Sequence, residues 1–97
     1  MPIYQVTPLA KNTELVRSAI EKRISEADRF EIPNDAGWFV RFTGTTVELS
    51  HKIEITGQPQ GVPTPVGSTL ITHIVAYYGR GGTDMWEWLK TRFESQA

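Results

Sequence analysis

The amino-acid sequence predicts an α+β fold in which a single domain, residues 1–97, combines an antiparallel sheet with three helices. Apolar residues recur at three- and four-residue intervals in some stretches and alternate in others, which indicates amphipathic helices and half-buried strands. Clusters of proline, glycine and asparagine separate these stretches and mark turns. A chain of 97 residues, 39% of them hydrophobic, can bury one modest core.

The first segment predicts a short strand followed by a helix. Ile3, Tyr4 and Val6 precede Pro8, which has no N–H to donate to a sheet. Asn12 is a favourable N-cap residue, and the positions after it carry an apolar stripe of about four turns. The stripe consists of Val16, Ala19, Ile20, Ile24 and Ala27.

Residues 30–42 predict a β-hairpin. A short apolar strand leads into residues 33–37, which begin with Pro-Asn-Asp and are typical of a turn. Because Phe39 lies on the face opposite its two neighbours, we expect the second strand of the hairpin to be central in the sheet. The other apolar side chains of that strand, the first of which we expect in the core, are Trp38, Val40 and Phe42.

A short helix and a long loop follow the hairpin. Thr45 and Glu48 have the spacing of a capping box, and Leu49 and Ile53 lie one turn apart on the same helical face. Residues 56–67 are rich in glycine and proline and predict a long loop without helix or strand. We expect this loop to be mobile rather than functional.

The last strand and turn are strongly marked. Residues 70–75 place apolar side chains on both faces of an extended chain, which favours a central, buried strand. The glycines at positions 79, 81 and 82 would supply positive φ for a tight turn.

A terminal helix is predicted after that turn. Thr83 is expected to cap it, and Asp84 would lie in its first turn, where the helix dipole favours a carboxylate. The pattern places Trp88 off the inward stripe, which is predicted to consist of Met85 or Trp86, Leu89 and Phe93.

The resulting order, β-α-β-β-α-β-α, is that of a ferredoxin-like split βαβ fold with an added C-terminal helix. We expect the helices of the βαββαβ unit to cover one face of the sheet and to leave the other face partly open. Either a second copy or the terminal helix would cover that open face.

Two stretches also resemble known families. The WFVRF strand followed by TVELSHKI is similar to small ferredoxin-like proteins grouped with the CRISPR spacer-acquisition subunit and its SinR-like relatives. The block YYGRGGTDMWEWLK resembles one in short bacterial proteins without an established activity. Members of the nuclease-linked group place an aspartate after the first strand for metal binding. Residues 6–9 hold no carboxylate, so the resemblance does not extend to metal-dependent nuclease activity.

Composition excludes several classes of protein. A net charge of −1 gives no basic excess for nucleic acid, and the absence of cysteine rules out disulfides and thiolate zinc sites. The N-terminal residues lack the pattern of a signal peptide, and the longest apolar run, residues 74–78, is too short for a membrane helix. We therefore expect a cytoplasmic protein.

No catalytic constellation is visible. His51 and His73 have no partner at the spacing of a catalytic pair or of a metal site, so we expect structural or surface roles for both. The sequence predicts no catalytic residue, no metal ligand and no cofactor.

The segment from Gly79 to Thr83 is a candidate anion site. Arg80, Gly81, Gly82 and Thr83 connect a strand to a helix start, where backbone amides attract phosphate. The segment lacks the Gly-Lys-Ser/Thr ending of a P-loop. The alternative is that these residues form a tight connection and nothing more.

Aromatic residues beside arginines form the second candidate site. Tyr77, Tyr78 and Trp88, together with Arg80 and Arg41, could stack against bases of a single-stranded nucleic acid. Aromatic side chains are equally characteristic of interface cores, so a dimer contact is an alternative of the same weight.

The sequence thus favours a non-catalytic binding or interaction module that forms a homodimer, with a further protein partner possible. A nucleic-acid-binding protein or degenerate nuclease is the first alternative, and an anion or small-metabolite site at the Gly79–Thr83 turn is the second.

Overall fold

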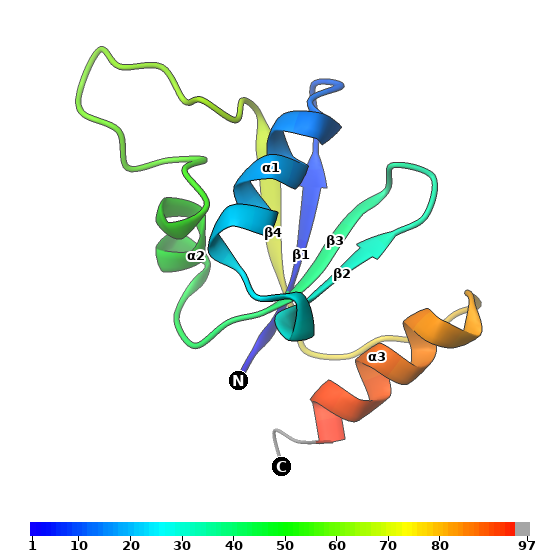
Figure 1. Cartoon of the computed structure of the whole chain (residues 1–97). Helices are drawn as coiled ribbons and strands as arrows, with labels where there is room; N and C mark the ends of the chain where they lie inside the picture. Colours follow the sequence, from blue (N-terminus) through cyan, green and yellow to red (C-terminus); the bar gives the residue numbers. More distant parts are fainter. Residues whose placement is uncertain (95–97) are drawn as a thin grey trace.

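The computed structural model describes residues 1–94 and contains four strands, three α-helices and one short 3₁₀ helix (Figure 1). The element order predicted from the sequence is confirmed, with the 3₁₀ helix added before the second strand. The elements are β1 (Ile3–Pro8), α1 (Thr13–Arg23), η1 (Glu26–Asp28), β2 (Arg29–Ile32), β3 (Gly37–Arg41), α2 (Thr46–Lys52), β4 (Thr69–Ile74) and α3 (Thr83–Glu94).

All neighbouring strands of the sheet are antiparallel, in the order β2-β3-β1-β4. Val6 on β1 lies opposite Trp38 on β3 and Ile71 on β4. The expected central position of β3 is confirmed, because β3 lies between β2 and β1. The Phe42 N–H donates to the Pro2 carbonyl at 3.0 Å, so the residues of β1 that bond towards β3 are the even-numbered ones.

The main core lies between the sheet and the pair α1 and α2 (Figure 1). Trp38 is 2% exposed, as expected for a core residue. The capping box of α2 is confirmed: the Glu48 N–H donates to the Thr45 hydroxyl, and the Thr45 N–H donates to the Glu48 carboxylate. Buried residues of this cluster are Tyr4, Val6, Val16, Ile20, Ile24, Trp38, Val40, Leu49, Ile53, Ile55 and Val66.

The opposite face of the sheet is partly covered by α3, one of the two coverings expected from the sequence. Trp88 and Leu89 pack with Ile3 and Phe39 in a second, smaller core. The prediction that Trp88 points away from the helix stripe is wrong, since Trp88 is 8% exposed and its ring lies 6.4 Å from that of Phe39. The stripe is wider than predicted because the helix rests on aromatic side chains from two strands. The remaining predicted members, Met85, Trp86 and Phe93, are partly buried in this core.

The expectation that residues 70–75 form a central strand is wrong. β4 is at the edge of the sheet, and it ends at Ile74. The apolar side chains on the two faces of β4 pack in different cores. Ile71 packs under α1 and α2, and Ile74 packs with the residues of α3. Leu70 remains 50% exposed.

Two helix starts differ from the predictions. Asn12 precedes α1, but its side chain makes no capping bond and instead donates to the carbonyls of Val66 and Ser68 at 2.7 and 3.1 Å. At α3, Gly82 precedes the helix and accepts from the Trp86 N–H, so Thr83 is the first helical residue and not the cap. α1 also ends at Arg23, and its stripe therefore stops short of Ala27.

The turn before α3 has less unusual backbone geometry than expected. Gly79 has a φ of +150°, whereas Gly81 and Gly82 do not have positive φ.

Residues 56–67 contain no helix or strand and arch away from the sheet in Figure 1. Both ends of this loop are tied to the fold. The Gln58 side-chain amide and the Thr64 hydroxyl donate to the Glu54 carbonyl at 2.9 and 3.1 Å, and Val66 enters the main core. None of the helices within residues 1–94 has the length and apolar character needed to cross a membrane.

Candidate interaction surface

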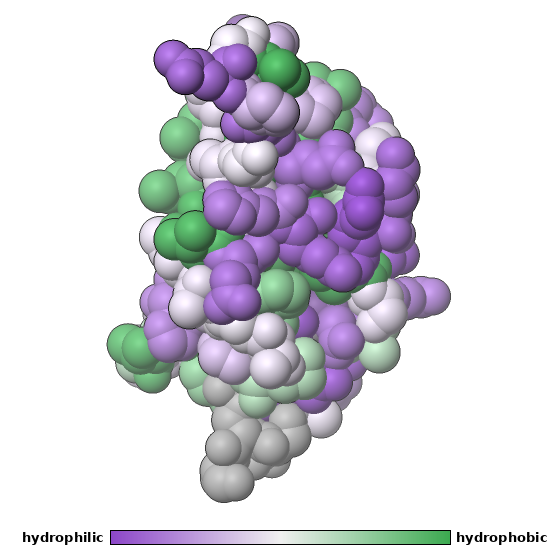
Figure 2. Space-filling model, turned by 90° about the vertical axis from the view of Figure 1, so that its left-hand side faces the viewer, coloured by the Kyte–Doolittle hydropathy of each residue, from purple (hydrophilic) through white to green (hydrophobic). Residues whose placement is uncertain are grey.

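The strongest candidate surface is the outer edge of β4, which is the side of residues 69–74 that faces away from β1. Within residues 1–94 no strand lies beside this edge. Leu70 is half exposed and Val75, directly after the strand, is 79% exposed. Figure 2 views the side of the molecule on which α2 and the 56–67 loop lie in Figure 1, and it shows hydrophobic side chains along its left margin beside a mostly hydrophilic centre.

The direction of each backbone group of β4 follows from one hydrogen bond. The Leu9 N–H donates to the Ser68 carbonyl at 3.0 Å, in the same register as the β1–β4 pairs. Hydrogen-bonded and non-hydrogen-bonded pairs alternate along an antiparallel ladder. Residues 68, 70, 72 and 74 therefore bond towards β1, and Thr69, Ile71 and His73 direct their N–H and C=O groups outward.

The two edges of the sheet differ in their protection against pairing with another chain. In natural proteins, short length, charged side chains or proline prevent an edge strand from pairing with another chain. β2 has four residues, carries Arg29 and Glu31, and is closely followed by Pro33. β4 has six residues, TLITHI, with no Asp, Glu, Lys, Arg, proline or glycine. The outer edge of β4 thus has none of these protecting features.

This edge was missed by the sequence analysis. The lack of charge and proline in residues 69–74 is visible in the sequence, but the same lack is typical of a central strand. Only the pairing of β4 with β1 distinguishes the two cases. His73, expected to be structural or on the surface, is exposed on β4, with its ring 5.1 Å from that of Tyr4.

The predicted aromatic site is divided by the fold. Tyr77 packs on Trp86 and Phe93, with ring centroids 5.5 and 4.9 Å away. Tyr78 is fully exposed, and Arg80 is exposed without an ion-pair partner among the described residues. Tyr78 and Arg80 are thus available to a partner, on the segment that leads from β4 to α3.

The other members of that predicted site make contacts within the chain. Trp88, a residue of α3, is buried between this helix and the sheet. Arg41 donates to the Asp28 carboxylate at 2.9 Å, and Arg92 donates to the Ala27 carbonyl at 2.7 Å and lies over the Trp88 ring. The fold therefore does not gather these cations and aromatic rings into one exposed nucleic-acid surface.

The Gly79–Thr83 turn is exposed, but its helix start already has a carboxylate beside it. The Asp84 side chain accepts from the Met85 N–H at 3.0 Å. An external anion would approach the same amides as this carboxylate and would be repelled by its charge. The anion site remains a prediction without added support.

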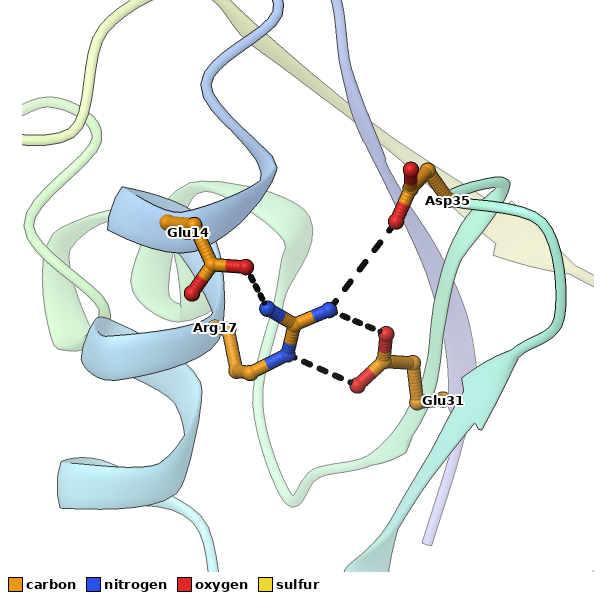
Figure 3. Close-up of polar contacts among 4 residues, drawn as sticks. All are labelled: Glu14, Arg17, Glu31 and Asp35. Carbon is orange, nitrogen blue, oxygen red and sulfur yellow. Dashed lines mark hydrogen bonds and ion pairs between the residues drawn. The ribbon is translucent and has the colours of Figure 1, made fainter.

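Arg17 forms a charged network that the sequence did not indicate (Figure 3). Its guanidinium donates to Glu31 at 3.0 and 2.6 Å and to Glu14, and it lies 4.0 Å from Asp35. The hydrogen bonds from Arg17 hold the pKa of the Glu31 carboxyl below its usual range, although burial opposes this shift. The pKa of Arg17 is raised in turn, mainly by Glu31 and then by Glu14. The network joins α1 to the β2–β3 hairpin.

An open pocket near the long loop has a volume of about 470 Å³. It lies between the end of α2 and the loop, and its lining includes His51, Glu54 and Val62. Within residues 1–94 no three His, Cys, Asp or Glu side chains are arranged to hold a metal ion. The pocket presents no arrangement of groups that favours a particular reaction.

No protein-family model, curated protein or solved structure matches this chain.

Proposed function

We propose that this chain is a non-catalytic interaction module with a ferredoxin-like fold that acts as a homodimer. The sheet order β2-β3-β1-β4 supports the fold assignment. In this order the strands joined through α1 are separated by one strand, as are the strands joined through α2, which is the split βαβ arrangement.

The observation that carries the functional proposal is the unprotected outer edge of β4. Its outward N–H and C=O groups form a ready template for another strand. A second copy presents the same six uncharged residues, so two copies meet without like-charge repulsion in the strand. The half-exposed Leu70 and the exposed Val75 would lose water contact in such a pair.

In this homodimer the segment between β4 and α3, which runs from β4 towards the side of β2 in Figure 1, remains exposed. Tyr78 and Arg80 project from each copy and provide the aromatic and cationic groups that are enriched in protein interfaces. They are the residues we assign to contact with a further protein partner.

The test is the oligomeric mass of the chain and of two lysine variants. We expect a dimer for the native sequence at a concentration on the order of 100 µM, where a dimer of micromolar affinity is almost fully formed. Thr72→Lys places like charges at the pairing strands and should give a monomer. Gln60→Lys adds the same charge on the exposed loop and should leave the dimer intact. A monomeric native chain at this concentration would overturn the proposal.

A further inference from the structure

We infer that two copies pair through the outer edges of β4 in one defined register, antiparallel and centred on Thr72, with Leu70 opposite Ile74 of the second copy. This inference rests on the proposed homodimer and specifies its interface. It follows from the directions of the backbone groups, from twofold symmetry and from the side chains of β4.

The alternation of inward- and outward-bonding residues along β4 restricts the possible registers of the pair. Only Thr69, Ile71 and His73 direct their backbone groups outward along β4. In an antiparallel pair these residues must lie opposite residues of the second copy whose backbone groups also point outward. Two identical strands related by a twofold axis also require the axis to pass through one residue position of both copies. Axes near the middle of the strand, at Ile71 or at Thr72, retain the most pairs.

The two registers differ in their backbone bonding. With the axis at Thr72, Ile71 of each copy forms a hydrogen-bonded pair with His73 of the other, and Thr72 faces itself in a non-hydrogen-bonded position. With the axis at Ile71, the outward residues form three pairs within β4: Thr69 with His73 twice, and Ile71 with itself. With the axis at Thr72 they form two pairs within β4, and Thr69 lies opposite position 75 just beyond the strand. The backbone permits both registers, so the side chains decide between them.

Side-chain contacts favour the register centred on Thr72. With the axis at Thr72, Leu70 lies opposite Ile74 twice, and the two threonines face each other between these pairs. Apolar pairs and Thr–Thr pairs across strands are both favourable. With the axis at Ile71, Leu70 would lie opposite Thr72, and Ile74 would face Ser68. Two apolar side chains would then be paired with polar ones.

The twofold axis stands perpendicular to the sheet, so corresponding faces of the two copies lie on the same side. Helices α1 and α2 of both copies cover one face of a continuous sheet, and both α3 helices lie on the other. Leu70, Thr72 and Ile74 share the face of α3, because Ile74 packs with that helix and side chains alternate. The interface therefore carries a stripe of these side chains between the two α3 helices.

Single-cysteine cross-linking tests this register, because the native sequence contains no cysteine. In Thr72→Cys the paired Cα atoms would be about 4.5 Å apart in a non-hydrogen-bonded pair, within the range of a disulfide. Ile71→Cys reports the rival register. Gln60→Cys, on the exposed loop, measures disulfide formation through random collision. The full chain is used in each case, and circular dichroism and mass measurements before oxidation establish that each variant folds and dimerises.

We expect Thr72→Cys to form a disulfide dimer roughly tenfold or more faster than both other variants under mild oxidation, because pairing gives its thiols a high effective concentration. Faster cross-linking of Ile71→Cys would overturn the Thr72-centred register. Slow cross-linking of both strand variants in a chain that remains dimeric by mass would place the interface elsewhere, and would overturn the inference while leaving the homodimer standing. A monomeric native chain would overturn both.

Discussion

Arg17 connects elements that are distant in the sequence through one guanidinium group. It lies over the Trp38 ring at 5.8 Å and reaches carboxylates on α1, on β2 and in the following turn (Figure 3). Because these carboxylates are exposed to water, each pair by itself adds little to stability. The depressed pKa of Glu31 nevertheless gives the network a measurable dependence on pH.

The first prediction concerns Glu31→Gln and its effect on the melting temperature. The pKa of Glu31 is lower in the folded than in the unfolded chain, so its stabilising effect is present above the unfolded pKa. This effect is lost as the pH falls through the folded pKa. The variant should therefore melt below the native chain at neutral pH, and the difference should disappear in acid, once Glu31 is protonated in the folded chain.

Glu14→Gln is the matched control, because Glu14 is far more exposed and shares the same arginine. Its melting difference should be smaller at neutral pH. A difference for Glu31→Gln that stays constant as the pH falls through the whole acidic range in which the chain is folded would show that its charge does not contribute.

Asn12 has a different role from the one its position suggests. The side chain is 8% exposed, and it accepts from the Ala10 N–H while its amide donates to the 66–69 segment. The N-cap pattern was read correctly as a helix start, but the side chain joins the start of α1 to the end of the long loop.

Asn12→Ala should therefore lower the free energy of unfolding by about 1–3 kcal/mol, the cost of leaving the Val66 carbonyl without its donor; the Ser68 carbonyl keeps the Leu9 N–H. Urea unfolding measures this difference. Asn12→Asp is the informative comparison: it keeps a good capping residue but places a carboxylate oxygen against two carbonyls. We expect it to be at least as destabilising as alanine. If Asn12→Asp were as stable as the native chain, the main role of this side chain would be to cap α1.

At the scale of elements, the β2–β3 hairpin depends on close approach of its turn to β1. Gly37 has a φ of +112°, and a Cβ there would overlap the backbone carbonyl of Val6. Gly61, in the long loop, has a φ of +83° with open space around it. The two glycines share the unusual backbone conformation and differ in their surroundings.

Gly37→Ala should for this reason lower the free energy of unfolding clearly more than Gly61→Ala does. For Gly61→Ala the strained backbone alone costs on the order of 1 kcal/mol. Chemical denaturation of both variants gives the comparison. Equal losses would mean that the hairpin shifts to admit the methyl group without a penalty.

Helix α3 is held to the sheet by a small set of large side chains. Trp88 contacts the rings of Phe30 and Phe39, with centroids 6.2 and 6.4 Å away, and Leu89 is fully buried beside it. No other helix within residues 1–94 covers this face. The attachment of α3 therefore depends on Trp88 more than on its polar contacts.

Trp88→Ala should destabilise the chain by about 3–5 kcal/mol, as for other large core side chains, and should release α3 from the sheet. Tyr78→Ala removes an aromatic ring of comparable size from a fully exposed position and should change stability by no more than about 0.5 kcal/mol. Thermal unfolding followed by circular dichroism measures both. Similar melting temperatures for the two variants would contradict the packing of α3.

For the whole molecule, the elements with local signals were predicted well, and the position of β4 in the sheet was not. The helix at residues 13–23, the hairpin and the capping box at Thr45 all depend on residues close in sequence. The sequence predicts a central β4 because its apolar residues fit a strand that is buried on both faces. In the structure these residues fit an edge strand between two separate cores, and that choice depends on contacts made far along the chain.

The candidate site shows the same division. The exposure of Arg80 agrees with its position in a glycine-rich turn. The pairing of Arg41 with Asp28 and the burial of Trp88 depend on how η1 and α3 fold against the sheet, and neither has a local signal. The outer edge of β4 is recognised only from the sheet order, in which β1 lies on one side of β4 and no strand of residues 1–94 lies on the other.

The most direct test of the dimer through β4 is the hydrogen exchange of individual backbone amides at several protein concentrations. The amides of Ile71 and His73 point outward, whereas the Thr72 amide bonds towards β1 and is protected in either state. We predict that protection of Ile71 and His73 rises with concentration, in step with the dimer mass, while that of Thr72 rises no more than in the rest of the sheet. Rapid exchange of Ile71 and His73 at concentrations where the chain is dimeric would contradict pairing through this edge.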